Sequence, residues 1–200
     1  MDGIILLNGD PYSGKIDTKG KFVICCDGAL EWATRAGVRV DLCVGDFDSL
    51  GYLPYNAKVF PVEKNLTDGE IALDEAKERG IKRVEIYGGS GRREDHFFGN
   101  AGLLLRARSL DIDATFFSDY TEFRLAEGRV EINEKAGTTV SLFSISEFLH
   151  INRSEGLKYS ADGLTLRRGE SRCLSNILTK DKAAIEILSG LGIIFIVRKL

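Results

Sequence analysis

The sequence predicts an α/β N-terminal domain with a mostly parallel sheet, followed by an all-β C-terminal sandwich domain. Two patterns in the 200 residues support this division. Up to about residue 120, short apolar runs alternate with helical patterns, as in a parallel sheet covered by helices. After Thr121 the apolar runs are short and are separated by Gly, Asn, Asp and Ser. We therefore expect a first domain over residues 1–122 and a second over residues 123–200, with the boundary inside Asp119–Gly128.

The N-terminal half contains strand and helix patterns in alternation. The expected strands are Gly3–Leu7, Phe22–Cys26, Leu42–Gly45, Lys58–Phe60, Arg83–Tyr87 and Ala114–Phe117. The expected helices are Ala29–Ala36, Thr67–Arg79 and Asp95–Ser109. Thr67 and Glu70 have the spacing of a capping box, and Gly37 and Gly80 are natural helix ends. The third helix would place Phe97, Ala101, Leu104 and Leu105 on one apolar face.

The C-terminal half contains four further apolar runs, and no long helical pattern accompanies them. These runs are Thr138–Ser144, Leu164–Leu166, Ala184–Leu188 and Ile193–Val197. Short strands separated by turn residues are typical of an antiparallel sandwich or barrel.

Composition and charge exclude several classes of protein. The chain has 30 acidic and 27 basic residues, a net charge of −3, which argues against a nucleic-acid partner. No segment approaches the roughly 20 apolar residues of a membrane span. The first residues lack a basic leader and a cleavage site, so we expect a cytoplasmic protein. The four cysteines form no Cys-x-x-Cys pair and are interpreted as buried, reduced thiols.

Acidic and glycine-rich clusters follow the predicted strands. Asp27-Gly28-Ala29, Gly45-Asp46-Phe47-Asp48-Ser49 and a turn beginning Gly88-Gly89-Ser90-Gly91 each come directly after a strand. Ligands of open α/β sheets bind at this edge. Asp46 and Asp48 are two residues apart and in an extended stretch would point the same way, which favours a shared Mg²⁺. The glycines would let backbone amides approach phosphate.

Each cluster alone has a simpler interpretation. Gly45-Asp46-Phe47-Asp48 could be a solvated turn, and Asp68 is explained as an acid in the first turn of a helix. His96 could be an ordinary helical residue, and Phe97 and Phe98 are interpreted as core residues. Because all the clusters would converge on one edge of one sheet, we favour a cation and phosphate site over unrelated turns.

The ordered set of clusters resembles the thiamine pyrophosphokinase family. That family's pattern runs Asp-Gly-Ala, Gly-Asp-x-Asp-Ser, Thr-Asp opening a helix, a glycine-rich turn ending Arg-x-Asp-His, and a later Ser-Asn. The matching residues here are Asp27-Gly28-Ala29, Gly45-Asp46-Phe47-Asp48-Ser49, Thr67-Asp68, Arg93-Glu94-Asp95-His96 with Asn100, and Ser175-Asn176. Gly156-Leu157-Lys158-Tyr159 is also similar to a segment of bacterial members.

The resemblance implies transfer of the diphosphate group of ATP to thiamine, giving thiamine diphosphate and AMP. It implies Mg²⁺ as cofactor, and a homodimer with its active sites at the interface. The implied catalytic and metal-binding residues are Asp46, Asp48, Asp68 and Asp95. The implied nucleotide-binding residues are Asp27, Gly28, Ser49, Thr67, Gly88, Gly89, Ser90, Gly91, Arg93, His96 and Asn100. Ser175 and Asn176 would bind thiamine.

Two other functions are compatible with the same residues. One is a magnesium-dependent phosphohydrolase in which an aspartate attacks phosphate. The other is a non-catalytic nucleotide-binding module. The four carboxylates are better placed as ligands than as a nucleophile, and binding alone needs fewer charges, so diphosphate transfer is preferred.

Overall fold

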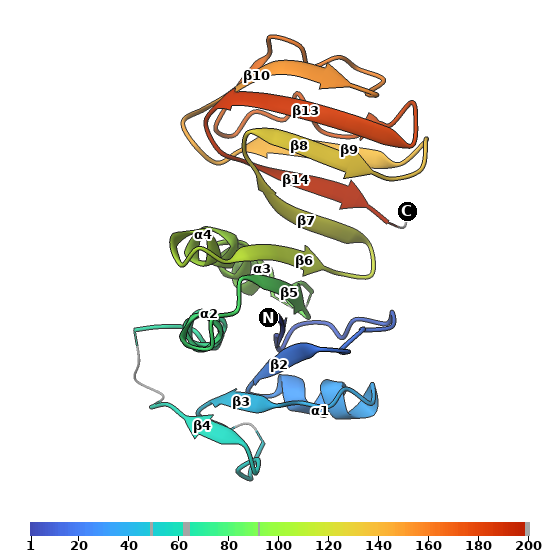
Figure 1. Ribbon diagram of the computed structural model, residues 1–200. Coiled ribbons are helices and arrows are strands. Elements are labelled where there is room, and N and C mark those ends of the chain that lie inside the picture. Colours follow the sequence, from blue (N-terminus) through green and yellow to red (C-terminus); the bar gives the residue numbers. More distant parts are fainter. Residues whose placement is uncertain (49, 62–64, 92, 199–200) are drawn as a thin grey trace. The chain divides into compact units, whose positions relative to one another are not determined.

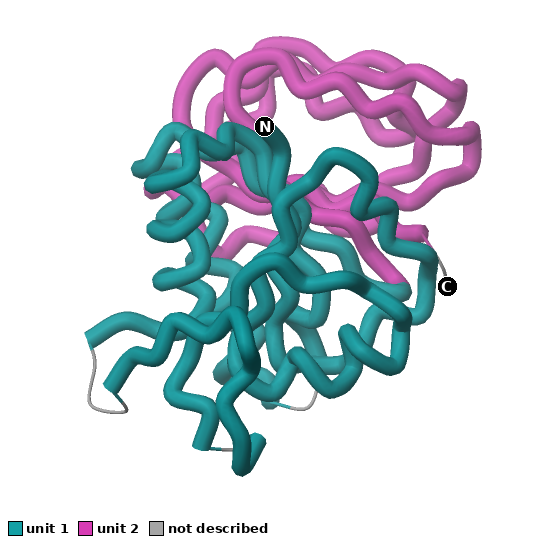
Figure 2. Tube along the Cα trace, turned by 60° about the horizontal axis from the view of Figure 1, so that its bottom comes forward, with its two compact units in different colours: residues 1–119 teal, residues 120–200 magenta. Residues whose placement is uncertain are grey.

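The computed structural model describes residues 1–48, 50–61, 65–91 and 93–198 and divides the chain into two compact units (Figure 1). Unit 1 comprises Met1–Asp119 and unit 2 comprises Tyr120–Leu200 (Figure 2). No helix within the described residues is long and apolar enough to cross a membrane. The fold class expected from the sequence is confirmed: helices cover a parallel sheet in unit 1, and unit 2 is built from antiparallel strands.

Unit 1 is a six-stranded parallel sheet in the order β6-β5-β1-β2-β3-β4. Its strands are β1 (Asp2–Leu6), β2 (Lys21–Cys26), β3 (Leu42–Gly45), β4 (Ala57–Val59), β5 (Arg83–Tyr87) and β6 (Asp113–Phe117). Its helices are α1 (Ala29–Arg35), α2 (Asp68–Glu78), α3 (Glu94–Ala101) and α4 (Leu103–Ser109). The chain runs from β1 outward to β4 and then returns to the other side of β1 as β5.

The two faces of this sheet are covered by different helices. Trp32 and Ala33 of α1 pack with Leu6 and Cys25 on one face, and α2 contacts β1, β2 and β3. The capping box of α2 is confirmed, because the Thr67 hydroxyl accepts from the Glu70 N–H while Glu70 accepts from the Thr67 N–H. All four cysteines are buried and free, as expected. A hydrogen bond with Cys43, together with burial, raises the pKa of the Cys25 thiol far above its usual value.

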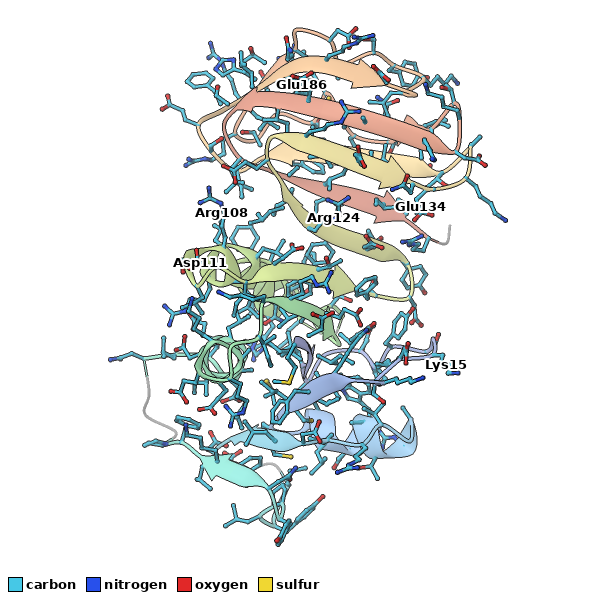
Figure 3. The ribbon with its side chains drawn as sticks, in the orientation of Figure 1. Lys15, Arg108, Asp111, Arg124, Glu134 and Glu186 are labelled. Carbon is cyan, nitrogen blue, oxygen red and sulfur yellow. The ribbon has the colours of Figure 1, made fainter. Side chains whose placement is uncertain are left out.

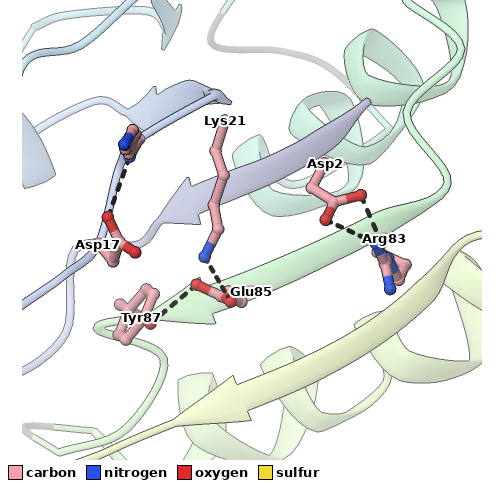
Figure 4. Close-up of polar contacts among 7 residues, drawn as sticks. Asp2, Asp17, Lys21, Arg83, Glu85 and Tyr87 are labelled. Carbon is pink, nitrogen blue, oxygen red and sulfur yellow. Dashed lines mark hydrogen bonds and ion pairs between the residues drawn. The ribbon is translucent and has the colours of Figure 1, made fainter.

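Ion pairs between charged side chains join strands at the centre of the same sheet. Lys21 on β2 reaches over β1 to Glu85 on β5, with 2.6 Å between Nζ and Oε1, and the Tyr87 hydroxyl donates to the other oxygen of Glu85 (Figure 4). Arg83 binds Asp2 in a forked contact, with Nη2 2.9 Å from Oδ2 (Figure 4). These contacts join β5, β1 and β2, the strands whose carboxyl ends carry most of the candidate site.

Unit 2 is a sandwich of two antiparallel sheets, ordered β12-β9-β14-β7 and β11-β10-β13-β8. Its strands are β7 (Thr121–Ala126), β8 (Arg129–Asn133), β9 (Thr139–Ser144), β10 (Phe148–Glu155), β11 (Thr165–Arg167), β12 (Asn176–Ile177), β13 (Lys182–Ser189) and β14 (Gly192–Val197). One apolar cluster, including Ile132, Leu142, Leu149 and Ile194, fills the space between the sheets. Of the charged side chains labelled in unit 2, Glu186 is exposed, whereas Arg124 and Glu134 are half-buried (Figure 3).

The structure corrects the expectation of one helix over Asp95–Ser109. The segment forms α3 and α4, separated at Gly102, whose N–H bonds to the carbonyl of Gly99 three residues back. Two glycines so close together weaken a continuous helical ladder. The expected apolar face is wrong in part, because Leu105 is 47% exposed. The interpretation of Phe98 as a core residue is also wrong, because this side chain is 83% exposed.

Four strands of unit 2 were not expected from the sequence. They are β7, β8, β10 and β12, and β7 occupies most of the segment that was interpreted as a domain boundary. The sequence-based division at residue 122 stays a prediction.

Candidate active site

A pocket of about 590 Å³ lies within unit 1 at the carboxyl ends of its central strands. It is lined by Leu7, Asn8, Gly9, Cys26, Asp27, Asp46, Thr67, Asp68, Gly69, Gly89, Gly91, Arg93, Asp95, His96, Gly99 and Asn100. The expectation that several clusters converge on one edge of the sheet therefore corresponds to a real concavity. Ten of the predicted site residues line it: Asp27, Asp46, Thr67, Asp68, Gly89, Gly91, Arg93, Asp95, His96 and Asn100.

The other predicted residues have different positions. Gly28, Asp48, Gly88 and Ser90 belong to the same turns but are not part of the pocket lining. Ser49 lies outside the described residues. Ser175 and Asn176 lie in unit 2.

Three carboxylates come together at the ends of β2 and β3. Ligand oxygens of Asp27, Asp46 and Asp48 all lie within 4.8 Å of one another. This group differs from the predicted metal ligands, because Asp27 takes part, whereas Asp68 and Asp95 do not belong to it. Three carboxylates at this spacing repel one another, and hard oxygen donors are the ligands that Mg²⁺ prefers. The donor set therefore fits a divalent cation.

The approach of Asp46 to Asp48 arises from a turn rather than from the extended backbone expected. Phe47, between them, has a φ of 60°, and the Asp48 N–H donates to Asp46 Oδ1 over 3.2 Å. Phe47 is only 3% exposed, so its ring anchors this left-handed conformation in the core. Gly45 has a φ of 152°, and a Cβ there would lie 3.0 Å from the Cβ of Asp27.

Asp95 is bound to Arg93 in a forked ion pair. The Nε–Oδ1 distance is 3.0 Å and the Nη2–Oδ2 distance is 2.5 Å, and the His96 N–H also donates to Asp95. The hydrogen bond from Arg93 lowers the pKa of Asp95 to about 2, and Asp95 in turn raises the pKa of Arg93. Asp95 is therefore charged at neutral pH and is occupied by Arg93 in this structure.

The glycine-rich turn after β5 is packed against the segment after β1. Gly88 has a φ of 71°, and a Cβ on it would lie 2.3 Å from the carbonyl oxygen of Leu7. A Cβ on Gly89 would lie 2.4 Å from the ring of Phe116. The Asn100 amide holds the turn from the other side by donating to the Gly89 carbonyl over 3.0 Å. Glycine is required here because the backbone passes so close to its neighbours.

The first turn of α2 contributes Thr67 and Asp68. Asp68 is partly buried, and its carbonyl accepts a contact from Cys26 Sγ at 3.5 Å. A Cβ on the next residue, Gly69, would lie 2.7 Å from a methyl of Leu103, so α2 packs closely on α4 at this point. Helix α2 packs on β2 and β3. This packing fixes the start of α2 relative to the carboxylates that follow these two strands.

Asn8 and Gly9 line the pocket but were missed by the sequence reasoning. An Asn-Gly pair after a strand is a common turn sequence, so it carries no chemical signal of its own. The signal that could have found it is topological, since these residues follow the strand at which the sheet order reverses.

Ser175 and Asn176 of unit 2 are the residues expected to bind thiamine, and Asn176 is hydrogen-bonded to the segment at Tyr159. Asn176 is buried; its Oδ1 accepts from the Tyr159 N–H at 3.1 Å, and its Nδ2 donates to the Tyr159 carbonyl at 2.7 Å. Ser175 is exposed and has a φ of 55°. Tyr159 itself is 60% exposed. The side chain of Asn176 thus holds the main chain of an exposed aromatic residue.

Fold and pocket together define a two-domain protein of the kind that binds phosphorylated ligands at the edge of an open parallel sheet. The family model for the thiamin pyrophosphokinase catalytic domain matches residues 15–116. The model for the vitamin B1 binding domain of thiamin pyrophosphokinase matches residues 129–194. The chain belongs to the thiamin pyrophosphokinase family.

Individual relatives agree with this assignment. The chain is 27% identical over 166 residues to the thiamine pyrophosphokinase of Bacillus subtilis (strain 168), covering 78% of each sequence. The crystal structure of thiamin pyrophosphokinase from Geobacillus thermodenitrificans is 25% identical with a TM-score of 0.82, covering 100% of this chain and 98% of that one. The Bacillus subtilis crystal structure shares the fold with a TM-score of 0.86 at 24% identity, covering both chains fully.

Proposed function

We propose that this protein transfers the diphosphate group of ATP to thiamine, forming thiamine diphosphate and AMP. The observation that carries the proposal is the match of both family domains, in order, along one chain. The pocket of unit 1 supports it, because its carboxylates can hold the Mg²⁺ that a nucleotide phosphate chain carries and its glycines let the main chain approach the phosphates. Phosphohydrolase activity and mere nucleotide binding are not favoured by these matches.

We propose that Asp27, Asp46 and Asp48 hold Mg²⁺, with Asp68 and Asp95 completing the acidic surroundings. The bound ion would neutralise charge on the phosphate oxygens. The turn Gly88–Gly91 and the first turn of α3 would supply backbone amides to the phosphates. Arg93 would contribute its guanidinium when the incoming phosphate competes with Asp95 for it.

The attack of the thiamine hydroxyl on the β-phosphorus requires a proton acceptor. The ion pair with Arg93 lowers the pKa of Asp95 to about 2, so Asp95 is unsuited to accept that proton while the pair is intact. Asp95 would instead orient Arg93 through their ion pair and contribute negative charge to the pocket wall. Transfer then depends mainly on positioning and on charge neutralisation.

Unit 2 is proposed to bind the acceptor through Ser175, Asn176 and the exposed Tyr159. The match of the vitamin B1 binding domain to residues 129–194 supports this placement. We also propose, as the family resemblance implies, a homodimer in which the two kinds of unit complete each other's sites.

Product analysis tests the reaction directly. The protein incubated with ATP, thiamine and Mg²⁺ is expected to release AMP and thiamine diphosphate in equal amounts. The thiamine hydroxyl loses its proton and forms a bond to the β-phosphorus, while the bond from the β-phosphorus to the oxygen that bridges it to the α-phosphorus breaks and AMP leaves with that oxygen. Chromatography of the nucleotides and thiamine esters measures both products. ADP or inorganic phosphate as the main product would contradict diphosphate transfer, and omission of thiamine serves as the control.

The Asn176→Ala variant separates recognition of thiamine from that of ATP. We expect the thiamine KM to rise by about two- to tenfold with the ATP KM nearly unchanged, since one lost hydrogen bond costs roughly 0.5–1.5 kcal/mol. Because Asn176 also holds the main chain of Tyr159, the melting temperature of the variant should fall. Steady-state kinetics and thermal unfolding give the three values.

Asn176→Asp is the matched control, because it keeps the acceptor for the Tyr159 N–H but replaces the donor. A rise in the ATP KM alone would show that the two substrates have been assigned to the wrong units.

A further inference from the structure

Asn8 occupies the point at which the order of the sheet reverses. It follows β1, which pairs with β2 on one side and with β5 on the other. The chain leaves β1 toward β2 and returns to the opposite side as β5, so the end of β1 is the topological switch point. Open parallel sheets bind their ligands there. Asn8 lines the pocket together with Asp27 of the turn after β2 and Gly89 of the turn after β5.

The main chain on both sides of Asn8 is fixed by hydrogen bonds. The Leu7 N–H donates to the Tyr87 carbonyl at 2.8 Å, and the Gly9 N–H donates to the Gly88 carbonyl at 2.7 Å. The Leu7 carbonyl in turn accepts from Trp32 Nε1 at 3.1 Å. A residue held this firmly presents its side chain in a preorganised position, as a ligand-binding residue must.

The side chain of Asn8, by contrast, forms no hydrogen bond within the described part of the chain. Its amide rests on Gly28, where an added Cβ would lie 2.5 Å from Nδ2 and 3.2 Å from Oδ1. This close approach puts the amide directly over the turn that carries Asp27. The position is exposed to the pocket and leaves the donors of the amide available.

Three comparable donors of the pocket are already used by the fold. Asn100 donates to the Gly89 carbonyl, Arg93 is paired with Asp95, and the Thr67 hydroxyl belongs to the capping box of α2. The amide of Asn8 is uncommitted, and it is neutral. A positively charged donor at this place would form ion pairs with the three carboxylates and weaken their attraction for a cation. The neutral amide of Asn8 can donate to a phosphate oxygen and leaves the charge of those carboxylates unchanged.

We propose that Asn8 donates a hydrogen bond from Nδ2 to a phosphate oxygen of the nucleoside triphosphate. Its contact would hold the phosphate chain between the turn at Asp27-Gly28 and the turn at Gly88–Gly91. This role rests on the proposed function, because that function supplies the nucleotide.

The test measures nucleotide affinity without turnover. Calorimetric titration of the full chain in Mg²⁺ buffer uses an ATP analogue with a methylene bridge between the α- and β-phosphorus, in the absence of thiamine. Asn8→Ala and the similarly sized Asn8→Leu are each expected to raise the Kd on the order of 10- to 100-fold, as for a lost hydrogen bond to a charged group. Asn133→Ala, at an exposed asparagine of β8, is the matched control and should bind as the unchanged protein does.

Thermal unfolding of each variant establishes that it is folded, and Asn8→Leu remains informative if the alanine variant is not. Unchanged affinity in Asn8→Leu would overturn the proposal, since packing on Gly28 rather than hydrogen bonding would then account for any alanine effect. Loss of affinity dependent on Asn8 in a protein that forms no AMP would instead contradict diphosphate transfer and leave the role of Asn8 intact.

Discussion

The Asp46→Asn and Asp48→Asn variants are expected to lose roughly two to three orders of magnitude of thiamine diphosphate formation while remaining folded. Both residues belong to the group of three carboxylates whose oxygens lie within 4.8 Å of one another. Asparagine keeps the oxygen of Asp46 that accepts the Asp48 N–H, so the turn should survive while the charge is removed. In metal-free buffer the melting temperature should stay constant or rise, because a repulsion between like charges has been relieved.

The increase in melting temperature that Mg²⁺ produces should be smaller in both variants, since a ligand that binds only the native state stabilises it. Asp113→Asn, an exposed aspartate at the start of β6, is the control for charge alone. Loss of activity together with an equal loss of stability would indicate that these carboxylates support the fold rather than a cation.

A Gly88→Ala substitution should be far more damaging than Gly20→Ala, although both glycines have a φ of 71°. The strain of a left-handed alanine, about 1–2 kcal/mol, is common to both variants. At Gly88 the new Cβ would also lie 2.3 Å from the Leu7 carbonyl oxygen, whereas at Gly20 nothing lies within 4 Å. We expect an additional loss of roughly 2 kcal/mol or more at Gly88, with the nucleotide-binding turn displaced.

Chemical denaturation followed by circular dichroism measures the free energy of unfolding of both variants, and the ATP KM reports on the turn. Equal destabilisation of the two proteins would show that the segments after β1 and β5 can move apart at little cost.

Most of unit 1 could be predicted from its sequence because its elements are regular. Strand β5 has the predicted bounds Arg83–Tyr87, and the capping box of α2 is present as expected. The strands of unit 2 are harder to recognise, because one face of each sheet is polar. In β8 only Val130 and Ile132 are buried, and β12 has two residues, too few for a periodic pattern.

The candidate site was predicted in composition but not in geometry. Convergence of the clusters follows from strand order, which the alternating pattern implies. The grouping of Asp27 with Asp46 and Asp48 depends on left-handed turns at Asp27 and Phe47, and such turns at non-glycine residues leave no mark in the sequence. Asn8 was missed because an Asn-Gly pair has no chemical meaning until the position of its strand in the sheet is known.

Trp32 gives the protein a built-in optical reporter of nucleotide binding. It is the one tryptophan of the sequence, is 3% exposed, and donates from Nε1 to the carbonyl of Leu7, next to Asn8. A Cβ on Gly88 would lie 3.1 Å from its ring, so the indole also supports the glycine-rich turn. The indole therefore contacts residues next to the pocket. Because no other tryptophan contributes to the emission, nucleotide binding should shift the tryptophan fluorescence of the unlabelled protein.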